Sequence, residues 1–186
     1  MKMVIFDLDG TLADSLADLA LNVNKGLKAA GLPEHPVDAY RSFVGNGRVT
    51  LVKRAMGDAR RDHTKFNTVI STFNKEYLLH CNDNTTAYDG CPEMLRGLAD
   101  KGVLTAVLSN KPDGESLRSM LWLHHVAPDE CVYVGDSDVD VNTARNAGVK
   151  MAGVAWGFRG KQELLDAGAP FVADTPAELL DYLLGA

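Results

Sequence analysis

Two acidic residues stand at alternate positions directly after a short apolar run near the N-terminus. The run from Met3 to Phe6 predicts a buried strand, and Asp7 and Asp9 follow it. With a side-chain period of two, both carboxylates leave the strand end on the same side, and Gly10 lets the backbone turn close to whatever they hold. Paired carboxylates in a buried place repel each other and lose hydration, so this pair favours a cation. Oxygen ligands without a nearby His or Cys favour Mg²⁺ over zinc.

The elements that would position these carboxylates divide the chain into two parts. Residues 15–81 carry apolar side chains at helical spacing and no strand signal. After the polar stretch 82–86, strand and helix patterns alternate to the C-terminus, which predicts a parallel sheet with right-handed crossovers and helices on both faces. We therefore expect an α/β core of residues 1–14 and 82–186. The all-α domain of residues 15–81 would be inserted between its first and second strands.

Three of the predicted strands end in residues capable of chemistry. They end in Asp7 and Asp9, in Ser109-Asn110, and in Gly135-Asp136. Each has a simpler interpretation: Asp9 and Thr11 as caps of the next helix, Ser109-Asn110 as an ordinary turn, and Ser137 or Asp138 as a helix cap. Ligands in open parallel sheets bind beyond the carboxyl ends of the strands. Three such ends in one alternating fold therefore favour one shared site.

Composition excludes several classes of partner. The chain has 186 residues, 46% hydrophobic and 24% charged, with a formal charge of −6, so neither nucleic acid nor an anionic membrane is expected as a partner. No secretory signal pattern and no apolar run of membrane-spanning length is visible. Three cysteines without CxxC spacing suggest a reducing compartment. We expect a cytoplasmic monomer or homodimer.

The motifs at the strand ends resemble those of the haloacid dehalogenase superfamily of phosphotransferases. The string from Asp7 to Ser15 (DLDGTLADS) resembles the first signature, Ser109 to Pro112 the second, and Gly135 to Asp140 (GDSDVD) the fourth. The resemblance implies a Rossmann-like parallel core with an inserted helical cap, as in the phosphoglycolate phosphatase and β-phosphoglucomutase branch. The segments 156–159 and 164–169 are most similar to phosphoglycolate phosphatases.

This resemblance implies a Mg²⁺-dependent phosphatase of a small phosphorylated metabolite, with phosphoglycolate favoured. Asp7 is the expected nucleophile, which would form an aspartyl-phosphate that water then hydrolyses. At an ordinary pKa of about 3.9 it would already be ionised at neutral pH. Asp9 would donate a proton to the leaving alkoxide and later take one from water. Asp7, Asp9 and Asp136 would hold the metal, with Asp140 as outer support.

The expected substrate-binding residues come from both parts of the chain. In the core, Ser109 and exposed backbone amides would hold the phosphoryl oxygens. In the cap, an open glycine turn would bring backbone amides to an anion, and Arg48 would offer a fork to a carboxylate; we expect this loop to face Asp7 when the cap closes. The full set is Thr11, Gly45, Asn46, Arg48, Ser109, Asn110 and Lys111.

One departure from the family pattern is large. Relatives carry a further strand and turn between the second and fourth motifs, with a lysine in it, whereas no lysine lies between Lys111 and Lys150 here. Its absence would leave a sheet edge unprotected and remove a cation, which Lys111 would partly replace if the chain is this short. Two alternatives therefore stay open beside hydrolysis: a phosphomutase, and a catalytically weak relative that binds or regulates. A receiver-type phospho-acceptor ranks last, because it lacks the Asp-Gly-Thr turn and the helical insert.

Overall fold

Four consecutive apolar residues near the N-terminus form a strand in the interior of a parallel sheet. Strand β1 (Met3–Phe6) is buried along its whole length. Its side chains alternate between the two faces, so Met3 and Ile5 join one hydrophobic cluster while Val4 and Phe6 join another. Such a run without alternation in polarity is typical of a strand covered on both faces.

The computed structural model describes residues 1–109 and 114–185, and within them β1 is joined by four further parallel strands. The sheet order is β4-β1-β5-β6-β7. The other strands are β4 (Leu104–Val107), β5 (Cys131–Gly135), β6 (Lys150–Val154) and β7 (Val172–Ala173). Chain order reverses on either side of β1, which is where an open α/β sheet binds its ligands.

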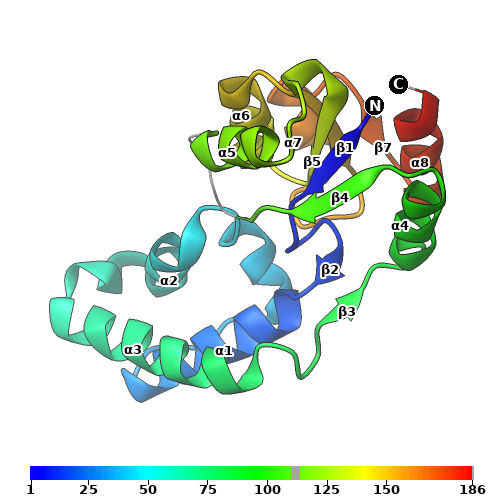
Figure 1. Ribbon diagram of the computed structural model, residues 1–186. Helices are drawn as coiled ribbons and strands as arrows, with labels where there is room; N and C mark the ends of the chain where they lie inside the picture. The colour runs from blue at the N-terminus through cyan, green and yellow to red at the C-terminus, as the bar shows by residue number, and fades with distance from the viewer. Residues whose placement is uncertain (110–113, 186) are drawn as a thin grey trace. The chain divides into compact units, whose positions relative to one another are not determined.

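Helices cover both faces of this sheet (Figure 1). The cluster that contains Met3 and Ile5 is completed by α5 (Glu115–Leu123), α6 (Asp138–Ala147) and α7 (Lys161–Asp166). The opposite cluster is completed by α4 (Cys91–Asp100) and α8 (Pro176–Gly185). A short 3₁₀ helix, η3 (Pro128–Glu130), precedes β5. The predicted α/β fold with a parallel sheet is confirmed.

Residues Asp14–Thr86 form a separate helical unit. Its elements are α1 (Leu16–Ala29), η1 (Val37–Ser42), α2 (Gly47–Met56), η2 (Gly57–Arg61) and α3 (His63–His80). Helix α1 packs along α3, where Val69 and Phe73 are buried. The chain divides into a core unit, Met1–Ala13 with Ala87–Ala186, and a helical unit, Asp14–Thr86. The bounds expected from the sequence were 1–14 with 82–186 for the core and 15–81 for the helical domain.

The sequence pattern did not predict the pairing at this division. Strands β2 (Ala13–Asp14) and β3 (Thr86–Ala87) form a two-stranded sheet where the chain passes from one unit to the other. Two residues are too few to show a period.

Of the helices within the described residues, none is both long and apolar enough to cross a bilayer.

The edge of the sheet is bare at β4. In the part of the chain that the structure describes, β4 pairs only with β1. Leu104 and Val107 remain 48% and 49% exposed, although strands in parallel sheets are ordinarily covered on both faces. The strand thus has the unprotected edge that the short connection between the second and fourth motifs led us to expect.

Asp18 ties the two ends of the helical unit together. Its carboxylate is 1% exposed and accepts hydrogen bonds from four donors, the backbone amides and side chains of Asn84 and Thr85, at 2.7–3.0 Å. Burial alone would raise the pKa of Asp18, but these hydrogen bonds outweigh it and hold the pKa below its ordinary value. The segment that follows α3 is thereby fixed to the first helix.

Asp18→Ala should lower the free energy of unfolding by about 3 kcal/mol, because it leaves buried donors without an acceptor. Because the folded pKa is lowered, the wild-type contribution is complete above about pH 4 and is lost as the pH falls through the folded pKa. Urea unfolding at pH 7 and pH 3 measures both effects. Asp38→Ala is the matched control, since that carboxylate is exposed. Equal losses in the two variants would contradict the role given to Asp18.

Candidate active site

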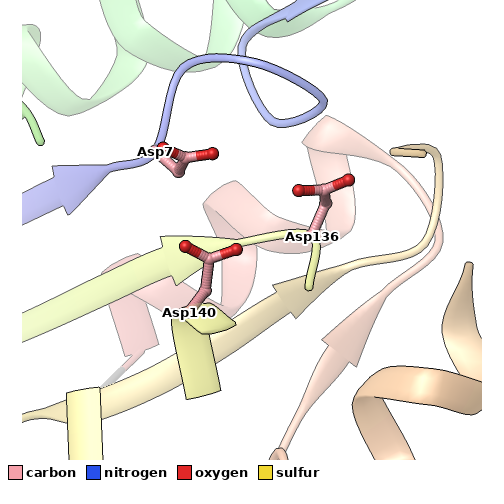
Figure 2. Close-up of side chains that lie close together, drawn as sticks. All are labelled: Asp7, Asp136 and Asp140. Atoms are coloured by element: carbon pink, nitrogen blue, oxygen red, sulfur yellow. The ribbon is translucent and has the colours of Figure 1, made fainter. Parts of the chain in front are cut away.

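Three buried carboxylates meet at the carboxyl ends of two neighbouring strands. Asp7 follows β1, Asp136 follows β5, and Asp140 lies in the first turn of α6 (Figure 2). One oxygen from each lies within 4.8 Å of the others. The carboxylates point toward one another across the space between these elements. The two strand ends and the first turn of α6 thus gather three carboxyl groups at one place.

Asp7 is held through its backbone and leaves one carboxylate oxygen unused. Its amide donates to the carbonyl of Val134 at 2.8 Å, which continues the pairing of β1 with β5 by one residue. Its side chain is buried, and Oδ1 has no hydrogen-bond partner among the described residues. A buried carboxylate oxygen without a hydrogen-bond donor destabilises the folded state unless a ligand supplies the missing interaction.

Asp136 is held by a loop that follows β6. Its Oδ2 accepts a hydrogen bond of 2.7 Å from the backbone amide of Phe158. Glycines occupy the two positions where a side chain would collide with this carboxylate: Gly10, which also has φ of +87°, and Gly157. The Trp156 Nε1 donates to the carbonyl of Thr11 at 3.0 Å, so the same loop also fixes the turn after Asp7. These contacts leave no room for a larger residue beside the carboxylate.

Asp140 serves the helix and the cluster at once. Its Oδ2 accepts a hydrogen bond from the amide of Ser137 at 3.0 Å, which is the bond that an acidic residue makes in a capping box at the start of a helix. The same oxygen accepts from the Ser137 hydroxyl at 2.7 Å. Its Oδ1 accepts from the hydroxyl of Tyr133 at 3.2 Å. The capping interpretation of this stretch is therefore correct for Ser137, and it does not exclude a role for the neighbouring acids in the site.

Burial and crowding raise the pKa values of these acids. Burial, followed by the charges of Asp140 and Asp136, raises the pKa of Asp7 well above its ordinary value. Burial and the charge of Asp140 raise the pKa of Asp136 to about 7, against the opposing effects of the Phe158 amide and the Arg159 charge. Burial also raises the pKa of Asp140. The ordinary pKa of about 3.9 assumed for Asp7 from the sequence is therefore too low for the cluster without a cation, because it is the pKa of a solvated residue.

The donor set fits a hard divalent cation. All the candidate ligand atoms are carboxylate oxygens, and the unpartnered Oδ1 of Asp7 belongs to the same cluster. The structure brings Asp7 and Asp136 together, as the sequence predicts. It places Asp140 directly in the group rather than behind it, while Asp9 lies outside the group among the described residues. Helix α1 begins at Leu16, with Ser15 as its N-cap residue, so neither Asp9 nor Thr11 caps it.

The other predicted site residues have different positions. Thr11 is buried, and its Oγ1 has no hydrogen-bond partner among the residues described. Ser109 is half-buried just beyond β4, and Asn110 and Lys111 lie outside the described residues. Gly45, Asn46 and Arg48 belong to the helical unit.

Within the helical unit, the predicted binding loop has its own supports. Asn46 is the N-cap residue of α2, and its Oδ1 accepts from Arg54 at 2.7 Å. The guanidinium of Arg54 also donates to the carbonyls of Phe43 and Val44, at 3.1 and 3.2 Å. Arg48 is exposed and donates to the side chain of Asn74 at 3.3 Å. The substrate-binding role of this loop stays a prediction.

Sequence reasoning missed the supports of the carboxylates. The hydroxyl of Tyr133 and the amide of Phe158 contact Asp140 and Asp136, and Gly157 provides the space beside Asp136. A backbone amide leaves no mark in a sequence, and Tyr133 reads as one more apolar residue of a buried strand. Only the Gly-Phe-Arg string after Trp156 was a signal, through its resemblance to a family tail.

Comparisons with known proteins identify the family of this chain. Residues 4–111 match the model of the haloacid dehalogenase-like hydrolases, and residues 109–186 match a HAD-hydrolase-like model. A phosphoglycolate phosphatase from Pseudomonas putida is 30% identical over 217 positions, covering 98% of this chain and 77% of that protein. One from Haemophilus influenzae is 29% identical, covering 98% of each.

A solved structure supports the same relationship. A protein from Lactobacillus delbrueckii subsp. bulgaricus, described as a candidate phosphoglycolate phosphatase, superposes with a TM-score of 0.92 at 29% identity, covering 100% of this chain and 99% of that one. The Pseudomonas putida alignment runs over 217 positions, more than the 186 residues of this chain. That relative therefore carries residues without a counterpart here.

The acidic cluster should make stability depend on pH in a direction opposite to that of Asp18. A carboxyl whose folded pKa is raised binds more protons in the folded state, so its contribution to the free energy of unfolding falls as the pH rises from about 4 to about 7. We compare the free energies of unfolding of Asp136→Asn and wild type, both in the presence of a chelator. The difference, variant minus wild type, should increase between pH 4.5 and pH 8 by more than about 1.4 kcal/mol, the equivalent of one pKa unit. Urea unfolding at both pH values gives the difference. A constant difference would refute the raised pKa of Asp136.

Proposed function

The chain belongs to the haloacid dehalogenase-like hydrolases and is a phosphatase of that family, and from this premise we propose that it hydrolyses a small phosphomonoester with the aid of Mg²⁺. The favoured substrate is phosphoglycolate, because relatives that align along 98% of the chain carry that activity in their names. One observation carries the proposal. It is the cluster of Asp7, Asp136 and Asp140 at the carboxyl ends of β1 and β5.

These three residues would hold the metal. When bound, Mg²⁺ supplies positive charge that offsets the repulsion among the carboxylates and between them and a phosphate dianion. The pKa values raised by burial and by the neighbouring carboxylates support this assignment, since a cation favours the ionised form of buried acids. Asp9 remains a proposed contributor to the same site.

The proposed reaction consists of two successive displacements at phosphorus. An oxygen of Asp7 forms a bond to phosphorus as the bond to the leaving alkoxide breaks, and Asp9 gives that alkoxide its proton. Asp9 then takes a proton from water, the oxygen of which attacks phosphorus and releases Asp7. The hydroxyls of Thr11 and Ser109 and the amide of Asn110 would bind the phosphoryl oxygens. Lys111 would add a positive charge beside them.

Substrate choice would belong to the helical unit. Gly45 has φ of +106° and no side chain to shield the neighbouring amides, and Arg48 presents a planar cation suited to a carboxylate. Phosphoglycolate carries both a phosphate and a carboxylate. Its phosphate would bind at the aspartate cluster, and its carboxylate would bind to Arg48 and the loop at Gly45. We expect a monomer or homodimer in the cytoplasm.

The test is a hydrolysis screen with phosphoglycolate, sugar phosphates and pyrophosphate, each with Mg²⁺ and with chelator. Release of inorganic phosphate from phosphoglycolate, dependent on Mg²⁺, is the expected result. Conversion of one sugar phosphate into its isomer without net phosphate release would indicate a mutase instead. No turnover of any compound would contradict the proposed activity.

Asp7→Asn should abolish phosphate release while leaving the fold intact, because the amide is nearly isosteric with the carboxylate but cannot act as the nucleophile. Steady-state hydrolysis and circular dichroism measure the two properties. Near wild-type turnover in Asp7→Asn would exclude the aspartyl-phosphate route. Asp14→Asn, a change of the same kind outside the proposed site, should keep its activity.

Arg48→Ala should change substrate preference more than it changes rate with a generic substrate. Loss of a fork to a carboxylate should raise the KM for phosphoglycolate by about tenfold or more, the equivalent of one charge-assisted hydrogen bond. The KM for a sugar phosphate should change little. Arg41→Ala, which removes an exposed arginine of the same unit, is the control. An unchanged ratio of the two KM values in Arg48→Ala would rule out this role.

A further inference from the structure

The hydroxyl of Tyr133 lies between the aspartate cluster and the end of a second strand. Tyr133 is in β5 and is 1% exposed. Its hydroxyl lies 2.9 Å from the carbonyl oxygen of Leu108 and 3.2 Å from Oδ1 of Asp140, and it is a donor to both. A phenol has one proton, so the two acceptors share a single donor.

The contact with Leu108 crosses a strand. In the order β4-β1-β5, Tyr133 is opposite Ile5 of β1, whereas Leu108 follows β4 on the far side of β1. The phenol therefore reaches across the face of β1 to the carboxyl end of β4. The amide of Leu108 donates to the carbonyl of Phe6 at 2.8 Å, so the residue before Ser109 is held at its amide by β1 and at its carbonyl by Tyr133.

This support matters because β4 is an edge strand. Among the described residues its only strand partner is β1. A strand inside a sheet is aligned by ladders on both sides, while β4 has one ladder of four residue pairs. Tyr133 supplies a hydrogen bond from β5 at the end of β4 from which the chain continues to Ser109.

The contact with Asp140 fixes the second oxygen of a cluster carboxylate. Oδ2 of Asp140 is occupied by the amide and hydroxyl of Ser137. Oδ1 receives the hydroxyl of Tyr133, so the carboxylate plane is set from both sides. Groups that orient a ligating carboxylate in this way ordinarily contribute tenfold to a hundredfold to metal affinity or activity.

We propose that Tyr133 is a positioning residue, which orients Asp140 for the divalent cation and holds the end of β4 that leads to Ser109. The inference rests on the proposed function, because it takes the aspartate cluster as a cation site. It assigns to one buried hydroxyl both the orientation of Asp140 in α6 and the position of the end of β4. Tyr133 itself touches neither substrate nor cation.

The experiment is calorimetric titration of the substrate-free protein with Mg²⁺, which has a readout other than activity. Tyr133→Phe keeps the ring and removes only the hydroxyl, and it should weaken Mg²⁺ binding by about tenfold or more. Tyr40→Phe is the matched control, since Tyr40 is also fully buried and donates to Oδ1 of Asn24 at 2.7 Å in the helical unit. It should lose stability and leave the Mg²⁺ affinity unchanged.

A double-mutant cycle separates positioning from a general loss of structure. In an Asp140→Asn background, Tyr133→Phe should change the Mg²⁺ affinity much less than in wild type, because the carboxylate that it orients is gone. Equal Mg²⁺ affinity in wild type and Tyr133→Phe would overturn the inference. Equal weakening in Tyr133→Phe and Tyr40→Phe, or additive effects in the cycle, would also overturn it.

Activity distinguishes this inference from the proposed function. If wild type binds Mg²⁺ more tightly than Tyr133→Phe but hydrolyses no phosphomonoester, the positioning role stands and the phosphatase proposal fails. If wild type hydrolyses phosphoglycolate with Mg²⁺ and Tyr133→Phe matches it in Mg²⁺ affinity, kcat and KM, the phosphatase proposal stands and the positioning role fails. Absence of Mg²⁺ binding by wild type would overturn both.

Discussion

Mutual repulsion among Asp7, Asp136 and Asp140 is the constraint that the rest of the core must offset. Three carboxylate oxygens within 4.8 Å in a buried place are destabilised both by lost hydration and by their neighbours. Such an arrangement persists only when the surrounding structure is stable enough to hold it. The two hydrophobic clusters on either face of the sheet supply that stability, and the rigid ends of β1 and β5 leave the acids little freedom to move apart.

The three acids differ in how they are held, and the differences are consistent with the different roles proposed for them. Asp136 is fixed by the Phe158 amide, and Asp140 is fixed by Ser137 and Tyr133. Asp7 has an oxygen that no described residue contacts by a hydrogen bond. A nucleophile must have an oxygen that is not already engaged, whereas a structural metal ligand benefits from being oriented by neighbours. The same cluster thus contains one available carboxylate and two anchored ones.

What could be predicted from the sequence follows from the range over which each signal acts. Helices and buried strands were predictable because periodicity and turn residues are local, and Asp7 and Asp136 were predictable because each directly follows such a strand. The pairing of β2 with β3 was missed because two-residue strands have no period. Tyr133 and Phe158 were missed because their contacts join segments separated in sequence. The raised pKa of Asp7 was missed because it depends on burial and on Asp136 and Asp140, which belong to a motif distant in sequence.

The exposed edge of the sheet at β4 and the hydrogen bonds that hold the end of this strand are connected. A parallel sheet normally continues until a helix or a charged, irregular strand covers its edge, but β4 consists of Leu-Thr-Ala-Val and has its apolar ends half exposed. The aligned relative from Pseudomonas putida has residues that this chain lacks, so an edge of this kind need not be shared by it. With one neighbouring strand, the carboxyl end of β4 is fixed from inside the core, by the amide pairing to Phe6 and by the Tyr133 hydroxyl, rather than by a strand on its outer side. An edge strand with one neighbouring strand can therefore keep its end before Ser109 in place, provided that its hydrogen bonds to Phe6 and Tyr133 remain.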